Sequence, residues 1–218
     1  MPPEAGLLDP DAIRDASADL GVLLSDGQAA LLTAFAALLM KWNRVHNLTG
    51  LESPADILSH HVLDSLSVVP ELVRIGAGHE QRVLDVGAGG GLPGVPVAVA
   101  LPESRVTMLD RVQKKTAFLQ QVCLELMLSN TAVVHSRVEE FRAPPFDVIV
   151  SRAFGALAAT VRMTSHLIAP TGSWVAMKGV YPAEEISALP STVELARAVK
   201  LRVPLLDAER HLVVLRPR

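Results

Sequence analysis

The sequence predicts an α/β fold in which a mostly parallel seven-stranded sheet with an antiparallel edge follows an N-terminal helical extension. From about residue 9 to residue 69, apolar residues recur at helical spacing and no strand pattern interrupts them. From residue 81 onward, short β-branched runs alternate with helical segments, which is typical of βαβ units and a parallel sheet. The last two expected strands are joined by residues 204–210, a segment better suited to a hairpin-like return than to a crossover helix.

The length and composition of the chain exclude several classes of protein. With 218 residues, half of them hydrophobic, it can build one domain with a small appendage. The single cysteine excludes an intrachain disulfide and a cysteine-held metal, so we expect no metal and a cytoplasmic location. The acidic start lacks a signal-peptide pattern, and the apolar run 29–40 is too short to cross a membrane. A formal net charge of -3 restricts any nucleic-acid contact to a local patch.

The N-terminal section is expected to contain two main helices. Ser25 fits the N-cap of the first, with Gln28 at the capping-box position. Asn47 and Gly50 lie where this helix should end. A second helix is expected from about Pro54 to Val69.

The remainder of the chain is expected to form the sheet. We divide the sequence into a helical section, 1–78, and an α/β section, 79–218, joined near the glycines of 76–78 and packed as one globular unit. The expected strands are Arg82–Val86, Arg105–Leu109, Thr131–His135, Asp147–Ser151 and Ser173–Met177, followed by about Ala198–Val203 and His211–Leu215.

The first expected strand runs into a glycine-rich turn, Asp85 to Gly94, which predicts a nucleotide-class site. Glycines can adopt positive φ there and let a ligand approach the backbone closely. A helix is expected from about Val95, with its free amide groups facing the ligand. A phosphate-binding P-loop is excluded, because Gly94 is followed by Val95 and Pro96 instead of Lys and Ser or Thr.

Two interpretations of this turn remain open from the residues alone. Gly89, Gly91 and Gly94 match the dinucleotide fingerprint, so a nicotinamide-dependent dehydrogenase with a Rossmann fold is one alternative. Asp85 suits a zwitterionic methionine moiety better than a pyrophosphate, which favours S-adenosylmethionine and methyl transfer. Asp110, at the end of the second strand, suits the ribose hydroxyls of either cofactor.

Motifs along nearly the whole chain resemble those of the RsmG (GidB) family of bacterial 16S rRNA guanine-N7 methyltransferases. Besides the turn, the resemblance rests on Trp42-Asn43 with Asn47-Leu48-Thr49, His61–Leu66, Ser136–Glu140, Ser151–Phe154, Lys178-Gly179 and Glu209–Val214. It implies a class I S-adenosylmethionine-dependent methyltransferase with a Rossmann-like sheet. The implied reaction methylates N7 of one guanine, position 527 in the 530 loop of 16S rRNA.

The resemblance also implies the partner and the cofactor. It implies 16S rRNA of the small ribosomal subunit as substrate and S-adenosylmethionine as methyl donor. We expect a monomer with neither a DNA nor a membrane partner. A non-catalytic ribosome-assembly factor that senses S-adenosylmethionine remains a further alternative.

Several site residues follow from the resemblance and from the turn. Gly87 and Leu92 match family positions that touch the cofactor, and Val138 with Glu139 matches the pair beside the adenine. Arg152 matches a further cofactor-site position and is the candidate for a catalytic role, because an arginine ending an apolar central strand needs a partner. The expected cofactor-binding residues are Asp85, Gly87, Gly89, Gly91, Leu92, Asp110, Val138, Glu139 and Arg152.

The expected chemistry needs no general base. Guanine N7 has an in-plane lone pair and no proton to lose, so direct in-line transfer would depend on alignment and a dry pocket. An acid near the guanine would favour the cationic product, and Glu139, Asp64 and Glu140 are unranked candidates. For Lys114 and Lys115, a solvated helix face is as well supported as an RNA contact. Basic residues at or just after strand ends are expected to bind RNA phosphates: Arg111, Lys114, Lys115, Arg137, Arg152 and Lys178.

Overall fold

The computed structural model describes residues 8–76 and 80–218. Residues 1–7 and 77–79, which include part of the expected linker 76–78, lie outside the described residues. Among the described residues, no helix combines the length and the apolar character that crossing a membrane requires.

A seven-stranded sheet in the order β3-β2-β1-β4-β5-β7-β6 confirms the expected architecture. Strands β1 to β5 are parallel, and β7 runs antiparallel to both β5 and β6. The strand order reverses between β1 and β4, the position where open α/β sheets bind ligands. The strands are β1 (Arg82–Val86), β2 (Arg105–Asp110), β3 (Thr131–His135), β4 (Phe146–Arg152), β5 (Ile168–Lys178), β6 (Val193–Leu201) and β7 (Arg210–Pro217).

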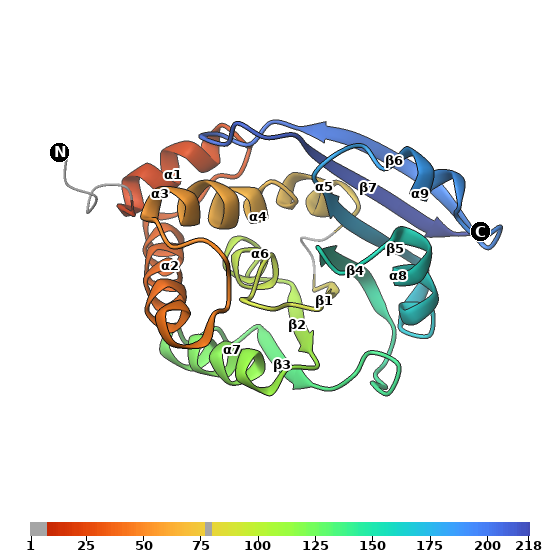
Figure 1. The fold of residues 1–218 in the computed structure, drawn as a ribbon, viewed down its shortest axis with the longest axis horizontal. Coiled ribbons are helices and arrows are strands. Elements are labelled where there is room, and N and C mark those ends of the chain that lie inside the picture. Colours follow the sequence, from red (N-terminus) through yellow and green to blue (C-terminus); the bar gives the residue numbers. More distant parts are fainter. Residues whose placement is uncertain (1–7, 77–79) are drawn as a thin grey trace.

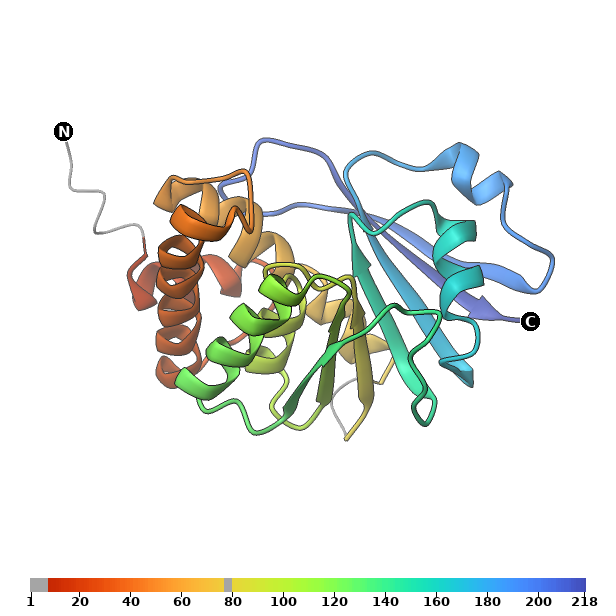
Figure 2. The same ribbon diagram turned by 60° about the horizontal axis from the view of Figure 1, so that its bottom comes forward.

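Helices cover both faces of the sheet (Figures 1 and 2). The N-terminal helices lie with α6 and α7 on one face, and α8 and α9 lie on the other. Successive side chains of β1 serve the two faces, since Val83 belongs to one buried core and Leu84 to the other. The helices are α1 (Pro10–Ala18), α2 (Asp26–His46), α3 (Pro54–Asp56), the π-helix η2 (Ile57–Leu63), α4 (Asp64–Leu66), α5 (Val69–Arg74), α6 (Gly94–Ala100), α7 (Gln113–Glu125), α8 (Leu157–Thr164) and α9 (Ala183–Ser187).

Helix α2 begins and ends as its sequence predicts. The Ser25 side chain accepts from the Gln28 amide, and the Gln28 side chain accepts from the Ser25 amide, which completes the capping box. Of the two expected end positions, Asn47 is the C-cap, in the left-handed region at φ 47°.

The second expected helix is interrupted twice. It contains the π-helical turn η2, and it ends at Leu66 instead of Val69. Pro70 has no amide hydrogen to donate to the Leu66 carbonyl, so the chain leaves the helix and restarts as α5. Apolar residues recur every three to five positions across both features, so the sequence pattern predicts one helix.

The edge strand β6 begins at Val193, earlier than the expected start at Ala198. Its first residues pair with the last residues of β7, as Val193 does with Pro217. Most of β6 is exposed. An exposed edge strand shows little apolar alternation, which explains the misplaced start.

Candidate functional site

The glycine-rich turn joins β1 to α6 at the C-terminal edge of the sheet. Gly87, Gly89 and Gly91 have φ angles of 72°, 57° and 81°. Residues other than glycine rarely adopt this left-handed backbone region. The amides of Gly87 and Ala88 both donate to the carbonyl oxygen of Leu109, at 2.8 Å and 3.0 Å. The turn is therefore fastened to the end of β2.

Asp85 lies behind the turn and is fully buried. Its Oδ2 accepts a 2.8 Å hydrogen bond from the amide of Gly94, the first residue of α6. Burial raises the pKa of this carboxyl to about 7, although the Gly94 hydrogen bond and the charge of Arg152 act in the opposite direction. Oδ2 is thus used within the fold, while Oδ1 is buried without a hydrogen-bond partner among the described residues, and the expected contact between Asp85 and a cofactor stays a prediction. The side chain holds the turn against α6, and the helix amide expected to face a ligand is used internally.

A cleft of about 430 Å³ opens beside the turn. We call it the first cleft. It lies over the C-terminal ends of β1, β2 and β4, and four of the expected cofactor residues line it. Its lining consists of Val86, Gly87, Leu109, Asp110, Arg111, Val112, Lys115, Ser136, Arg137, Val138, Glu139, Ala153, Phe154 and Met163.

Three other expected cofactor residues, Gly89, Gly91 and Leu92, shape the turn and do not line this cleft. A Cβ atom added to Gly91 would lie 2.7 Å from Val95 Cγ2 and 2.9 Å from Leu119 Cδ2. Leu92 is buried in the core under the turn. Gly91 is therefore needed for close packing of the turn on α6 and α7. The expected contact of Gly89, Gly91 and Leu92 with a cofactor stays a prediction.

Asp110 presents a carboxylate to the first cleft in a fixed orientation. Its Oδ2 accepts from the Gly89 amide at 2.9 Å, and its Oδ1 accepts from the Val112 amide at 2.8 Å. Each carboxylate oxygen has a second lone pair. Asp110 can therefore accept further hydrogen bonds from a pair of hydroxyl groups.

A second cleft, of about 440 Å³, adjoins the first. The two clefts share Ala153 and Phe154, in the loop after β4. The Phe154 ring lies over Gly87, and Ala153 has a left-handed φ of 53° that turns the chain toward the glycine turn. The second cleft is lined by Leu51, His60, His61, Asp64, Ser151, Arg152, Ala153, Phe154, Gly155, Met177, Lys178, Gly179 and Arg210.

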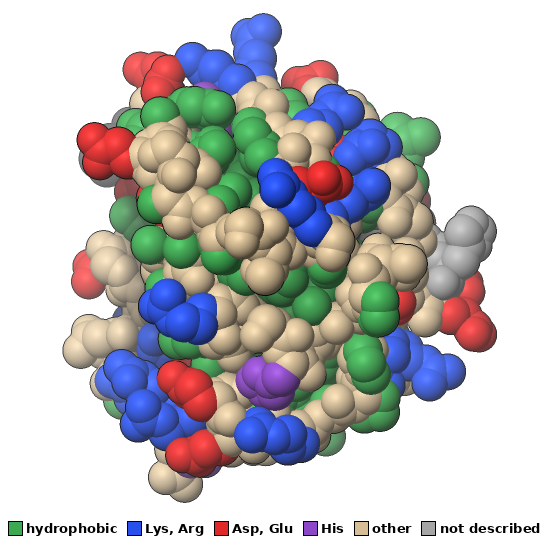
Figure 3. All heavy atoms as spheres, turned by 90° about the vertical axis from the view of Figure 1, so that its right-hand side faces the viewer, with side chains coloured by type: hydrophobic (Ala, Val, Ile, Leu, Met, Phe, Trp, Pro, Cys, Tyr) green, Lys and Arg blue, Asp and Glu red, His purple; other side chains and the backbone are tan. Residues whose placement is uncertain are grey.

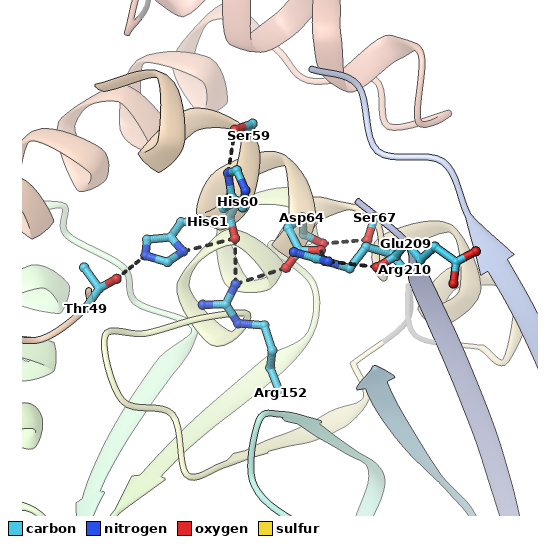
Figure 4. A network of polar contacts seen from close by, with 9 residues as sticks. All are labelled: Thr49, Ser59, His60, His61, Asp64, Ser67, Arg152, Glu209 and Arg210. Carbon is cyan, nitrogen blue, oxygen red and sulfur yellow. Dashed lines mark hydrogen bonds and ion pairs between the residues drawn. The ribbon is translucent and has the colours of Figure 1, made fainter. Parts of the chain in front are cut away.

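Arg152 lines the second cleft and not the first, and its expected contact with the cofactor stays a prediction. Its Nη1 donates to the His60 carbonyl oxygen at 2.9 Å and to Asp64 Oδ2 at 3.1 Å. The Nε of Arg210 donates to Asp64 Oδ1 at 2.8 Å (Figure 4). Asp64 is only 3% exposed, and it forms ion pairs with two arginines, one at the end of β4 and one at the start of β7.

His61 extends this network toward the loop after α2 (Figure 4). Its Nδ1 lies 3.0 Å from the His60 carbonyl oxygen, and its Nε2 lies 2.6 Å from Thr49 Oγ1. Burial and the nearby charge of Arg152 lower the pKa of His61 to about 4. A neutral ring that donates from Nδ1 and accepts at Nε2 satisfies both contacts.

Of the three unranked acids, only Glu139 lines the first cleft, and half of its side chain is exposed. Both carboxylate oxygens of Asp64 already accept from arginines. Glu140 lines neither cleft. The arrangement therefore favours Glu139 as the acid that a ligand can reach.

Three of the expected RNA-binding residues, Arg111, Lys115 and Arg137, line the first cleft. The Arg137 side chain is 60% exposed and lies 4.0 Å from Glu139. These cations form a local basic group despite the negative net charge. On the face formed by α8, α9 and the sheet edge, by contrast, Lys and Arg side chains are interspersed with Asp and Glu (Figure 3).

The other two expected RNA-binding lysines are used within the fold. Lys114 Nζ donates to the His46 carbonyl oxygen at 2.9 Å, at the C-terminal end of α2. Lys178 Nζ forms a 2.8 Å ion pair with Glu185 and also donates to the Gly155 carbonyl oxygen at 2.9 Å. The charge of Lys178 is therefore compensated within the fold, and its expected role in RNA binding stays a prediction.

Sequence reasoning missed Arg210 and Phe154 as individual site residues. Both lie within stretches that carried the family resemblance, so that resemblance was the available signal. Their roles depend on contacts across the fold, with Asp64 and with Gly87 respectively. In the part of the chain that the structure describes, His, Cys, Asp and Glu nowhere gather in threes that could hold a metal.

Comparison with known proteins gives matches over most of the chain. The family model described as "rRNA small subunit methyltransferase G" matches residues 28–213. A protein of that name from Laribacter hongkongensis is 51% identical, over 94% of this chain and 97% of its own length. Another, from Burkholderia pseudomallei, is 53% identical, over 89% of this chain and 85% of its own.

Solved structures show the same fold at low sequence identity. The magnesium protoporphyrin IX methyltransferase of Synechocystis, solved with bound S-adenosylmethionine, has a TM-score of 0.59 at 17% identity. The match covers 84% of this chain and 97% of that one. This likeness, together with the strand order, confirms the expected class I methyltransferase fold.

Proposed function

Because the chain belongs to the rRNA small subunit methyltransferase G family, we propose that it transfers a methyl group from S-adenosylmethionine to N7 of one guanine in 16S rRNA. Methylation of small-subunit rRNA is the activity that the family description names. The atom N7, and position 527 in the 530 loop as its location, are proposed from the sequence resemblance. We also propose a cytoplasmic location, which a small-subunit rRNA substrate supports.

The single observation that carries the proposal is the pair of adjoining clefts, joined at Ala153 and Phe154. A methyl transfer needs one site for the donor and one for the acceptor, with the reacting atoms in line between them. Both clefts lie at the C-terminal edge of the sheet, beside the switch between β1 and β4.

The residues of the first cleft fit S-adenosylmethionine. Its volume, about 430 Å³, lies within the range of small-molecule sites. Asp110 would accept from the ribose hydroxyls, and Val138 with Glu139 would flank the adenine. Gly87 lines this cleft, and the lack of a Cβ atom there leaves room for the Phe154 ring at the boundary of the two clefts. When bound, the cofactor supplies an electrophilic methyl group on a sulfonium.

The protein's own contribution is alignment and exclusion of water. Guanine N7 attacks with its lone pair and releases no proton, so no side chain has to act as a base. The two residues shared by the clefts, Ala153 and Phe154, have no titratable group. The apolar Phe154 ring, packed on Gly87, would help to keep the junction dry.

The rim of the first cleft supports an RNA substrate. Arg111, Lys115 and Arg137 would contact RNA phosphates at this rim. The two alternatives are not supported, because the matched relatives are named as methyltransferases and not as dehydrogenases or assembly factors.

The test is methylation of small-subunit rRNA by purified protein and labelled S-adenosylmethionine. Unmethylated rRNA and unmethylated subunits should each be tried, since either is a potential substrate form. We expect one methyl group per rRNA molecule. A treatment that cleaves RNA at N7-methylguanine should then cut the chain at a single guanine. Label confined to the protein, or on another base atom, would contradict the proposal.

A further inference from the structure

A buried ion triad lines the second cleft, which would hold the acceptor base. Asp64, with only 5% of its side chain exposed, lies between Arg152 at the end of β4 and Arg210 at the start of β7. The N–O distances are 3.1 Å and 2.8 Å, and each arginine side chain is 20% exposed. One carboxylate compensates two guanidinium groups, so the triad carries a net charge of about +1.

The π-helical turn η2 provides a second hydrogen-bond acceptor for Arg152. The Asp64 amide donates to the carbonyl oxygens of Ser59 and His61, and not to that of His60 as in an α-helix. The His60 carbonyl accepts from Arg152 Nη1 instead. The local change of helix type therefore supplies a second anchor for the guanidinium group.

These anchors leave part of each guanidinium group available. The contacts of Arg152 with described residues use only Nη1, and those of Arg210 use Nε and Nη1. Both arginines line the second cleft. The remaining cation in its lining, Lys178, is compensated by Glu185, and His61 is neutral near pH 7.

We propose that Arg152 and Arg210 bind a phosphate group of the target RNA strand, and that Asp64 is the residue that positions both. The inference rests on the proposed function, because it requires the target RNA strand to enter the second cleft while S-adenosylmethionine occupies the first. Two rigid guanidinium groups with unused N–H donors match the oxygens of a phosphate. A phosphate bound here would hold its nucleotide close to Ala153 and Phe154, where the target base meets the cofactor cleft.

The test is a double-mutant cycle between the protein and the RNA backbone. The probe is small-subunit rRNA that carries one neutral methylphosphonate linkage, placed 5′ or 3′ of the target guanine by ligation. Equilibrium affinity is measured for wild type and for Arg210→Met. Arg216→Met is the matched control, since Arg216 is an exposed arginine on the same strand.

For wild type, we expect one of the two methylphosphonate linkages to weaken binding on the order of tenfold. Arg210→Met should weaken binding to unmodified rRNA by a similar factor, reduce the salt slope by about one, and lose the sensitivity to that linkage. Arg216→Met should keep the sensitivity. The inference is overturned if neither linkage affects wild type, or if Arg210→Met retains the full effect.

The Asp64→Asn variant distinguishes a positioning role of Asp64 from the effect of its negative charge on RNA binding. It makes the triad more positive, so charge alone would strengthen RNA binding. A positioning role requires the opposite result: a loss of methylphosphonate sensitivity and a fall in kcat/KM for rRNA, with unchanged affinity for S-adenosylmethionine. Stronger binding with full sensitivity would overturn the role of Asp64. Arg210→Met keeps the test valid if Asp64→Asn fails to fold. Failure of the proposed function itself would show as wild-type protein that does not methylate rRNA.

Discussion

The ring of Phe154 lies directly over the backbone of Gly87, so that a Cβ atom added to Gly87 would lie 2.5 Å from Phe154 Cδ2. The two residues follow the ends of β1 and β4, which are neighbours in the sheet. Their contact forms part of the boundary between the two clefts. A glycine is required here for two reasons, the close approach of the ring and a φ of 72°.

Gly87→Ala is therefore expected to displace Phe154 and weaken binding of S-adenosylmethionine. The left-handed backbone should also cost about 1 to 2 kcal/mol of stability. Calorimetry of cofactor binding and thermal unfolding would measure the two effects. Gly155→Ala, in the same loop as Phe154 but with open space around its Cβ position, should change neither.

The double variant Gly87→Ala with Phe154→Ala tells steric displacement from backbone strain. If the ring is displaced by the new methyl group, removing the ring should return part of the lost cofactor affinity. The stability loss from the left-handed backbone should remain. Affinity that stays as low as in Gly87→Ala alone would show that the contact with Phe154 is not the cause.

Lys178→Met should leave the salt dependence of RNA binding unchanged, because the ammonium group is already paired with Glu185. The variant should lose about 0.5 to 1 kcal/mol of stability at most, since the pair is partly exposed. Lys115→Met, at the first cleft, is the comparison and should reduce the salt slope by about one. A reduced slope for Lys178→Met would contradict the structural role that we assign to this lysine.

The sequence pattern predicted the elements of the fold better than the direction of individual side chains. The alternating pattern predicts where β1 ends, but not that Asp85 turns inward to the Gly94 amide. Strand ends also placed Lys178 at the ligand edge correctly, yet its partner Glu185 could not be identified without the packing of α9.

Pairs of residues that are distant in the sequence could not be predicted from the sequence pattern either. Asp64 and Arg210 are 146 residues apart, and no local spacing relates them. The π-turn leaves the His60 carbonyl without the Asp64 amide as its partner, and the sequence pattern did not predict it. The family resemblance pointed to the stretches that contain these residues, but their roles required the fold.

The pH dependence of stability should contain two opposing terms, from His61 and Asp85. Burial and the charge of Arg152 lower the pKa of His61 from 6.5 to about 4, so the unfolded chain binds more protons between these values. His61 therefore contributes stability above pH 6.5 that is lost as the pH falls toward 4. By linkage, this term is on the order of 3 kcal/mol.

Asp85 has the opposite sign, because burial raises its pKa from 3.8 to about 7. The folded protein then binds more protons, so the contribution of Asp85 is present below pH 3.8 and is lost as the pH rises through 7. Denaturant unfolding of wild type, His61→Gln and Asp85→Asn from pH 4 to 7 would separate the terms. Relative to wild type, the unfolding free energy of Asp85→Asn should rise with pH, and that of His61→Gln should fall. Parallel curves for all three proteins would show that neither group titrates with a shifted pKa.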